Sequence, residues 1–249
     1  MRFILQTIDG YLVHDFTWAM LRAKEYYDWD GREDMTNVLS DISRVADAVD
    51  DPVLYVPVGS VEFVSEYLCR YFPAADPAVL LPLNVPTALF PFAGRRIANV
   101  KTPEDMSLFK DEKEVFVKSN TEIHSPWEGI YKILPGDSGR FFCGSQVSSV
   151  LDIRSEWRVF VFHGRILHAA CYSGDALVFP DADAVRAMAA AYDGAPAAWA
   201  LDVAVIGDGR TAVLECHRFF SCGLYGFNDY ARLPKMFSQT WFEMITTNR

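Results

Sequence analysis

The sequence predicts a mixed α/β (α+β) protein of 249 residues, with a small α/β domain followed by a larger domain rich in strands. Residues 52–71 contain an apolar run, a Gly-Ser turn and a helical pattern, which together form a βα unit. Further along, four apolar strands fall within residues 146–206, and an Ala-rich helix separates the last two. The domain boundary is expected near residue 97, which gives domains of residues 1–97 and 98–249.

The first domain is expected to alternate strands and helices. Short apolar runs closed by turn residues predict strands, and apolar residues at helical spacing predict helices. The expected elements are a strand at 3–8, helices at 15–27 and 35–49, a strand at 52–58 and a helix at 61–71. The Pro- and Ala-rich stretch that follows, up to Pro91, is expected to be a connection or an edge.

The second domain is expected to contain a glycine-rich connection followed by most of the strands. Residues 121–144 hold several glycines without long periodicity, so a mobile loop or hairpin is expected there. Before it, the pattern predicts a helix at 104–113 and a strand at 114–118. After it, the pattern predicts strands at 146–151, 157–162 and 165–170, a helix at 182–192, and strands at 198–206 and 211–216.

Composition excludes several classes of protein. The net charge is −10 and the pI is near 4.9, whereas binding of duplex nucleic acid usually needs a clustered basic face. Five cysteines without a Cys-x-x-Cys pair indicate free, mostly buried thiols in a reducing compartment. The N-terminus does not read as a secretory signal, and no apolar stretch is long enough for a membrane span. A soluble, cytoplasmic protein is therefore expected, and its oligomeric state is not readable.

Charged residues interrupt three of the apolar strands. Glu156 and Arg158 alternate with apolar neighbours, Asp202 lies inside a second strand, and Glu215 and His217 lie on one face of a third. Ionised side chains are costly to bury without a partner, so a shared polar face is expected. An arginine suits a phosphate and carboxylates suit a metal ion. Two alternatives stay open: a structural salt bridge between Arg158 and Glu156, and solvent-facing carboxylates on an outer sheet.

Other reactive side chains allow more than one interpretation. Lys118 ends the strand at 114–118, where its ammonium could contact a phosphate or simply extend to solvent. A nucleophilic cysteine would need a paired histidine in a recognisable arrangement, and none is evident. Buried structural thiols are therefore expected at Cys143, Cys171, Cys216 and Cys222.

In their order and spacing these residues resemble the ATP-grasp superfamily of ATP-dependent ligases, over roughly residues 100–230. The resemblance implies an ATP-grasp fold preceded by a small α/β domain, and ATP clamped between two small sheets under a lid at residues 121–144. It implies that Lys118 and Lys132 contact the phosphates of ATP and that Arg158 steadies the transferred phosphate. It places Gln146, Val147, Ser148 and Ser149 beside the adenine through main-chain groups, and Asp152 near the ribose hydroxyls.

The resemblance also implies a magnesium site formed by Asp202, Glu215 and His217. The chain departs from the family here, because the family usually has Glu-x-Asn where this sequence has Glu215-Cys216-His217. An imidazole is an unusual ligand for so hard a cation as Mg²⁺. The number of metal ions is therefore the open point of this assignment.

The activity implied by the resemblance is carboxylate–amine ligation. A substrate carboxylate would be activated as an acyl phosphate and joined to an amine, with release of ADP and phosphate. Small-molecule or peptide substrates are expected, and neither a nucleic acid nor a membrane is expected as a partner. Two alternatives remain: a catalytically inactive nucleotide-binding module of the same fold, and an interaction protein whose polar strand positions are structural.

Overall fold

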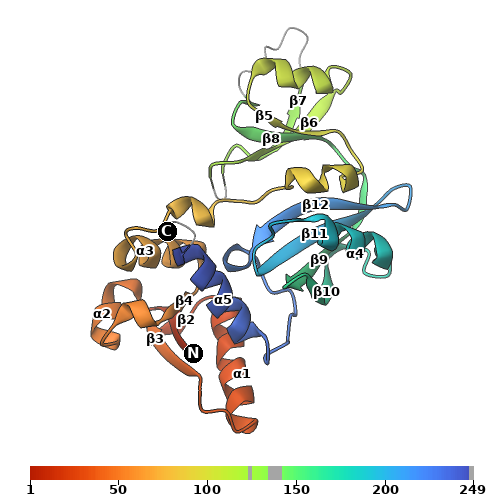
Figure 1. The fold of residues 1–249 in the computed structure, drawn as a ribbon. Helices are drawn as coiled ribbons and strands as arrows, with labels where there is room; N and C mark the ends of the chain where they lie inside the picture. The colour runs from red at the N-terminus through yellow and green to blue at the C-terminus, as the bar shows by residue number, and fades with distance from the viewer. Residues whose placement is uncertain (123–124, 134–141, 247–249) are drawn as a thin grey trace.

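The computed structural model describes residues 1–122, 125–133 and 142–246, and within them it contains three four-stranded sheets (Figure 1). Helices and strands are mixed along the chain, as the sequence predicts. The sheets lie in the N-terminal region, in a small lobe formed by the middle of the chain, and in the second half of the chain.

The N-terminal sheet is built around β1 (Arg2–Ile8). β3 (Thr36–Ser40) and β4 (Val56–Val58) pair with β1 in parallel on its two sides, and the short β2 (Tyr11–Leu12) pairs with it in antiparallel orientation. Parallel neighbours need a crossover connection, and the helix α1 (Asp15–Trp29) provides the one between β1 and β3.

Two expectations for the first domain are wrong in part. The helix expected at 35–49 begins instead as the strand β3, and only the turn Ile42–Arg44 and the helix α2 (Val45–Ala48) are helical. Short apolar runs fit either structure, and pairing with β1 decides for the strand. The strand expected at 52–58 is reduced to β4, because Asp51 caps a 3₁₀ turn at Pro52–Leu54. The helix α3 (Val61–Tyr71) has the expected bounds.

The small lobe holds a sheet in the order β5-β8-β6-β7. Its strands are β5 (Ile97–Val100), β6 (Glu114–Ser119), β7 (Gly129–Lys132) and β8 (Ser145–Ser149). The helix expected at 104–113 is a 3₁₀ helix at Pro103–Phe109, which begins with a Thr102–Asp105 capping box and a proline. Part of the expected lid, residues 123–124 and 134–141, lies outside the described residues.

The central sheet has the order β10-β9-β11-β12 and is antiparallel throughout. Its strands are β9 (Ile153–Phe162), β10 (Arg165–Gly174), β11 (Ala198–Ile206) and β12 (Thr211–Arg218). The helix α4 (Ala182–Ala191) packs with Val185 and Met188 against the apolar residues of one face, among them Val159 and Leu201. The polar residues therefore project from the other face.

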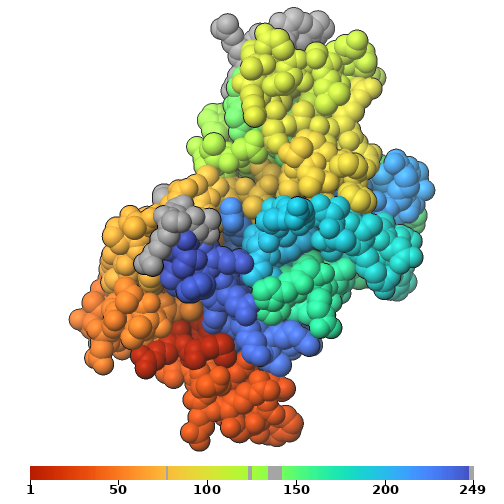
Figure 2. Space-filling model, in the orientation of Figure 1, coloured from red at the N-terminus to blue at the C-terminus, as the bar shows by residue number. Residues whose placement is uncertain are grey.

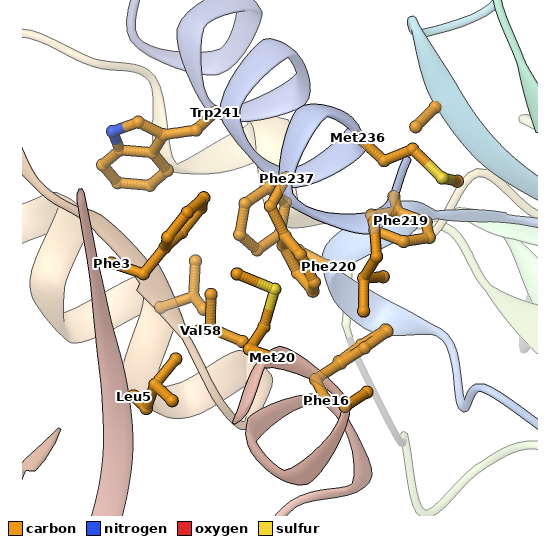
Figure 3. Packing of buried hydrophobic residues seen from close by; sticks show 14 of the residues in the cluster. Phe3, Leu5, Phe16, Met20, Val58, Phe219, Phe220, Met236, Phe237 and Trp241 are labelled. Carbon is orange, nitrogen blue, oxygen red and sulfur yellow. The ribbon is translucent and has the colours of Figure 1, made fainter. Parts of the chain in front are cut away.

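The C-terminal helix α5 (Leu233–Thr246), for which the sequence analysis assigned no element, joins the central sheet to the N-terminal sheet. Figure 3 shows Phe237 and Trp241 of α5 packed with Phe219 and Phe220 on one side and with residues of β1 and α1 on the other. The helix α5 thus completes the core that lies against the N-terminal sheet. The boundary at residue 97 stays a prediction.

The small lobe projects above the central sheet, as the yellow and green part of Figure 2 shows. The lower part of the molecule consists of the N-terminal sheet, its helices and α5. Among residues 1–122, 125–133 and 142–246, none of the helices combines the length and the apolar character needed to cross a bilayer.

Candidate functional site

Three charged residues form one row across the central sheet. Asp202 on β11 pairs in register with Arg158 on β9 and with Glu215 on β12. Directly opposed residues of antiparallel strands project from the same face, so the three side chains meet. His217 follows Glu215 by two residues and projects from that face as well. The structure therefore brings together four of the residues that the sequence singles out.

Arg158 and Asp202 form a bidentate ion pair in the interior. Arg158 Nε donates to Asp202 Oδ1 at 2.8 Å and Nη2 donates to Oδ2 at 2.6 Å, while the residues are 5% and 0% exposed. Burial disfavours both charges, yet the hydrogen bonds within the pair raise the pKa of Arg158 and lower that of Asp202. Pairing of Arg158 with Glu156 is wrong, and so is a solvent-facing Asp202.

A second ion pair lies beside the first and joins the small lobe to the central sheet. Lys118, near the end of β6, donates to Glu215 Oε2. His217 Nε2 lies 3.3 Å from Glu215 Oε1 and 3.2 Å from Asp202 Oδ2. Burial opposes the charge of Glu215, but hydrogen bonding to His217 and Lys118 holds the pKa of that carboxyl well below its usual range. Burial acts to lower the pKa of His217, but hydrogen bonds to the carboxylates of Asp202 and Glu215 raise it.

A cleft of about 330 Å³ opens between the small lobe and the central sheet, and Lys118 and Glu215 both line it. This volume is at the lower end of the roughly 300–1,000 Å³ of small-molecule sites. The lining comes mostly from the two sheets: Phe116, Lys118, Ile130, Gln146, Ser148 and Ser149 on one side, and Ile153, Glu156, Leu214 and Glu215 on the other.

A β-bulge places two consecutive residues of β12 in this lining. Glu215 pairs with Asp202 and Val213 with Val203, which leaves Leu214 as an extra residue in the ladder. Regular alternation would direct Leu214 and Glu215 to opposite faces, but both line the cleft. The bulge thus adds an apolar contact beside a carboxylate.

Asn84 links the two walls of the cleft. Its Nδ2 donates to Ser119 O at 2.7 Å and to Asn120 Oδ1 at 2.8 Å, and its main-chain oxygen accepts from Cys216 N at 2.6 Å. Asn84 is 2% exposed and adopts φ +50°, in the left-handed region that asparagine tolerates better than most residues. One buried side chain therefore contacts the small lobe while its backbone is bonded to β12.

The remaining predicted residues differ in their placement. Lys132 is exposed on β7, in the same strand face as the lining residue Ile130. Val147 faces the core of the small lobe, away from the cleft. Asp152 is exposed, and its carboxylate lies against Gly207, where a Cβ would be 2.4 Å from Oδ2. Lys132, Val147 and Asp152 thus lie outside the lining.

Gln146 uses its side chain within the protein. Its Oε1 accepts from Val85 N at 2.9 Å, and its Nε2 donates to Val85 O at 2.9 Å and to Asn99 Oδ1 at 3.0 Å. β8 is paired on both sides, so its main-chain groups bond to β5 and β6. The main chain leaves the sheet only after Ser149, where Val150 and Leu151 line the cleft.

Sequence reasoning gave no specific role in the site to Arg95 and Glu156, which line the cleft, or to Tyr172, which lies beside Glu156. Arg95 lines the cleft and donates to the main-chain oxygens of Ala93, Val213 and Leu214, while burial lowers its pKa to about 10. Glu156 also lines the cleft and accepts a hydrogen bond from Tyr172, which in turn reaches Asp202. Alternation around Arg158 marks the face of Glu156, but no sequence signal marks Arg95 or Tyr172.

The cysteines are all free, in agreement with the sequence analysis. Cys216 and Cys222 are buried, and burial raises the pKa of both thiols, that of Cys222 to about 12. A thiol with a raised pKa is a poor nucleophile, so these two are structural. Cys69 and Cys143 are exposed, so the expectation that the thiols are mostly buried is only partly right.

The side chains of Asp202, Glu215 and His217 meet some of the requirements of a site for a divalent cation. Ligand atoms of Asp202, Glu215 and His217 all lie within 4.8 Å of one another. Glu215 lines the cleft and offers the oxygen ligands that Mg²⁺ prefers. Both oxygens of Asp202 already accept hydrogen bonds from Arg158. Glu215 is itself paired with Lys118 and lies beside His217, so both carboxylates would have to exchange a donor to bind the ion, and Glu215 is the one of the two that lines the cleft.

The fold agrees with comparisons to known proteins. A family model described as "ATP-grasp domain, R2K clade family 2" matches residues 92–233, more than half of the chain. The chain belongs to this family. A comparison with the curated proteins gives no match.

Solved structures of similar fold cover nearly the whole chain. A D-cycloserine synthetase, DcsG, has a TM-score of 0.62 and 14% identity over 97% of this chain and 100% of its own. The ATP-grasp ligase PsnB, complexed with a minimal precursor, has a TM-score of 0.56 and 14% identity over 96% and 98%. The macrocyclase MdnC, bound with precursor peptide MdnA from Microcystis aeruginosa MRC, has a TM-score of 0.54 and 12% identity over 96% and 99%.

Proposed function

We propose that this protein is an ATP-dependent ligase that activates a substrate carboxylate as an acyl phosphate and joins it to an amine, releasing ADP and phosphate. The observation that carries the proposal is the cleft between the small lobe and the central sheet. Lys118 and Glu215 meet across it, and the Arg158–Asp202 pair lies directly beside Glu215 in the sheet. Membership of the ATP-grasp family supports the same nucleotide.

In this proposal the protein acts by positioning and by charge. The Lys118 ammonium is a compact donor for phosphate oxygens. It now donates to Glu215, and a phosphate oxygen of ATP would become a further acceptor for it. Arg158 offers a guanidinium whose direction is fixed by Asp202, so little reorganisation is needed as charge develops on the transferred phosphate. Positioning and charge neutralisation are the main requirements of phosphoryl transfer.

Magnesium would be held by Glu215, with His217 and Asp202 beside it. When bound, the ion neutralises phosphate charge and orients the transferred group. The His217 imidazole, held between two carboxylates, keeps both of them in place and limits their mutual repulsion.

The nucleotide base would lie at the end of β8. Main-chain groups are free of the sheet only beyond Ser149, so we assign the contact with adenine to residues 150–151, with Leu214 as an apolar floor. Lys132 would approach the phosphates from β7 if the lobe closes. Asp152 would reach the ribose only by turning away from Gly207.

Small molecules and peptides are the proposed substrates. One of the similar structures is described with a precursor peptide, a second with a minimal precursor and the third as a D-cycloserine synthetase, and these descriptions support both kinds of substrate. The test is an ADP-release screen against amino acids, peptides and amines, followed by mass spectrometry of the products. Acceptor-dependent ADP release with a condensed product is expected. ADP release without any product would contradict ligation.

A catalytically inactive nucleotide-binding module is the second candidate. It is favoured by His217 in place of the family's asparagine and by the full engagement of Asp202 with Arg158. In this case ATP and magnesium raise the melting temperature, but no acceptor produces turnover. An absence of any thermal shift would reject both candidates.

A further inference from the structure

Tyr172 occupies a β-bulge directly beside the Arg158–Asp202 pair. In the ladder of β10 and β9, Cys171 pairs with Trp157 and Ser173 with Glu156, so Tyr172 is an extra residue between them. A bulge sets two residues of one strand against one residue of its neighbour and re-aims a side chain. Here the phenol reaches the face of the sheet that carries the charged row.

The Tyr172 hydroxyl contacts two carboxylates at once. It lies 3.0 Å from Glu156 Oε2 and 3.1 Å from Asp202 Oδ2. A phenol has one proton, so it can satisfy the two acceptors only by sharing it. A tyrosine phenol is ordinarily protonated at neutral pH, so this one proton is available to the two carboxylates.

The ring of Tyr172 is held in place by stacking against the ring of Tyr225. Tyr225 stacks on it with ring centroids 4.9 Å apart and an interplanar angle of 19°, and Arg158 Cζ lies 4.7 Å from the Tyr225 centroid. Tyr225 adopts φ +41°, a left-handed conformation that costs energy for a residue with a Cβ. Tyr225 thus adopts a strained backbone conformation at the position where its ring stacks on Tyr172.

Glu156 has more freedom than Asp202. Asp202 is fully buried and is held by Arg158, whereas Glu156 is half-buried, lines the cleft and bonds to Tyr172. Without the phenol, the Glu156 carboxylate could turn into the cleft and add a mobile negative charge near Glu215. A further negative charge inside the cleft would repel the phosphates of a nucleotide bound there.

We propose that Tyr172 is a positioning residue, which holds the Glu156 carboxylate against the wall of the cleft and so keeps its charge away from the phosphates of a bound nucleotide. The inference rests on the proposed function, because it assumes that a nucleotide occupies the cleft. It adds to that function a residue that affects nucleotide binding through the Glu156 side chain.

The test is a double-mutant cycle read by calorimetric binding of ADP with magnesium. Tyr172→Phe keeps the ring and removes the hydroxyl, and it should weaken ADP binding about tenfold, because the released Glu156 carboxylate repels the phosphates. Glu156→Gln removes the charge and should change binding little. Tyr172→Phe combined with Glu156→Gln should bind nearly as Glu156→Gln alone does, because no charge is left to reposition.

Tyr192→Phe is the matched control, since Tyr192 is half-buried and packs edge-on against Trp199 in the core on the opposite face. It should leave ADP binding unchanged. Unchanged binding of Tyr172→Phe, or a double variant weaker than either single one, overturns the inference while leaving the proposed function intact. If the native chain itself binds no nucleotide, the proposed function fails, and this inference fails with it.

Discussion

At the level of single residues, Asp202 organises the charged network. Arg158, Tyr172 and His217 all place a nitrogen or hydroxyl against its two oxygens. Both members of the Arg158–Asp202 pair are almost inaccessible to water, so each charge depends on the other for compensation. Arg158, which is proposed to steady the transferred phosphate, therefore also belongs to the interior of the protein.

Arg158→Ala should lower the free energy of unfolding by about 3–5 kcal/mol, because it leaves the buried Asp202 charge without a partner. Urea denaturation followed by circular dichroism measures this loss. Arg186→Ala is the control, since its pair with Asp183 is 67% and 93% exposed. That change should stay within about 0.5 kcal/mol of the native protein. Equal losses in the two variants would show that burial of the pair has no bearing on stability.

Glu215→Gln should remove most of the effect of magnesium on nucleotide binding, because the amide lacks the charge that a divalent ion needs. The affinity for ADP, measured by calorimetry with and without magnesium, reports this effect. Glu66→Gln, at an exposed pair with Arg70 on α3, should respond to magnesium as the native chain does. A full magnesium response in Glu215→Gln would assign the ion to other ligands.

At the level of elements, the start of α1 is tied to the loop that covers Arg158. Asp15 Oδ1 accepts from Phe16 N at 2.8 Å, and Oδ2 accepts from Leu224 N at 2.7 Å. Gly223, the residue before Leu224, accepts from Arg158 Nη1 at 3.2 Å. The first residue of α1 thus holds the loop that contacts the Arg158 guanidinium.

Asp15 should make stability depend on pH in the acid range. Burial acts to raise its pKa, but hydrogen bonds from His14, Leu224 and Phe16 lower it below the ordinary 3.8. A depressed pKa in the folded state contributes stability that is present above the unfolded value and is lost as the pH falls through the folded value. Asp15→Asn should therefore be less stable than the native chain at neutral pH, by less than about 1 kcal/mol, because 45% of the Asp15 side chain is exposed and its charge is screened by solvent.

This difference between the native chain and Asp15→Asn should vanish once the pH is low enough to protonate Asp15 in the folded protein. Denaturation curves at several pH values between neutrality and the acid limit provide the measurement. Asp183, which is exposed in the first turn of α4, gives the control variant Asp183→Asn. A gap that stays constant across the whole pH range would contradict a role for the Asp15 charge.

Strands with strong alternation could be predicted from the sequence, and features set by pairing could not. The expected bounds match at β11 and α3, where apolar runs end in turn residues. The partner of Arg158 was not readable, because only the register of β9 and β11 places Asp202 opposite it. Bulges leave no mark in the composition, so the positions of Tyr172 and Leu214 also depend on the folded sheet.

At the level of the whole molecule, one apolar core joins the two ends of the chain. Phe237 of α5 is fully buried and lies with its ring centroid 4.9 Å from Phe16 of α1 and 4.9 Å from Phe219 after β12. The N-terminal sheet is therefore completed by residues that follow the central sheet in sequence. Unfolding of these parts should be a single transition.

Phe237→Ala should lower the free energy of unfolding by about 3–5 kcal/mol, because it leaves a cavity in this shared core. Phe242→Ala, on the same helix with 64% of the residue exposed, should cost less than about 0.5 kcal/mol. Urea denaturation monitored by tryptophan fluorescence and by circular dichroism compares the two variants. Separate transitions for the two probes would indicate that the ends of the chain do not share one cooperative core.

The bulges at Leu214 and Tyr172 have a consequence for the evolution of the chain. Leu214 and Tyr172 are each one residue more than the ladder requires, so deleting either leaves the remaining strand pairs in register. The sheet can therefore form without them, and selection for folding alone does not preserve them. Related chains that have lost nucleotide binding are expected to shorten these two strands by one residue, while lineages that keep both residues are those in which the cleft is still in use.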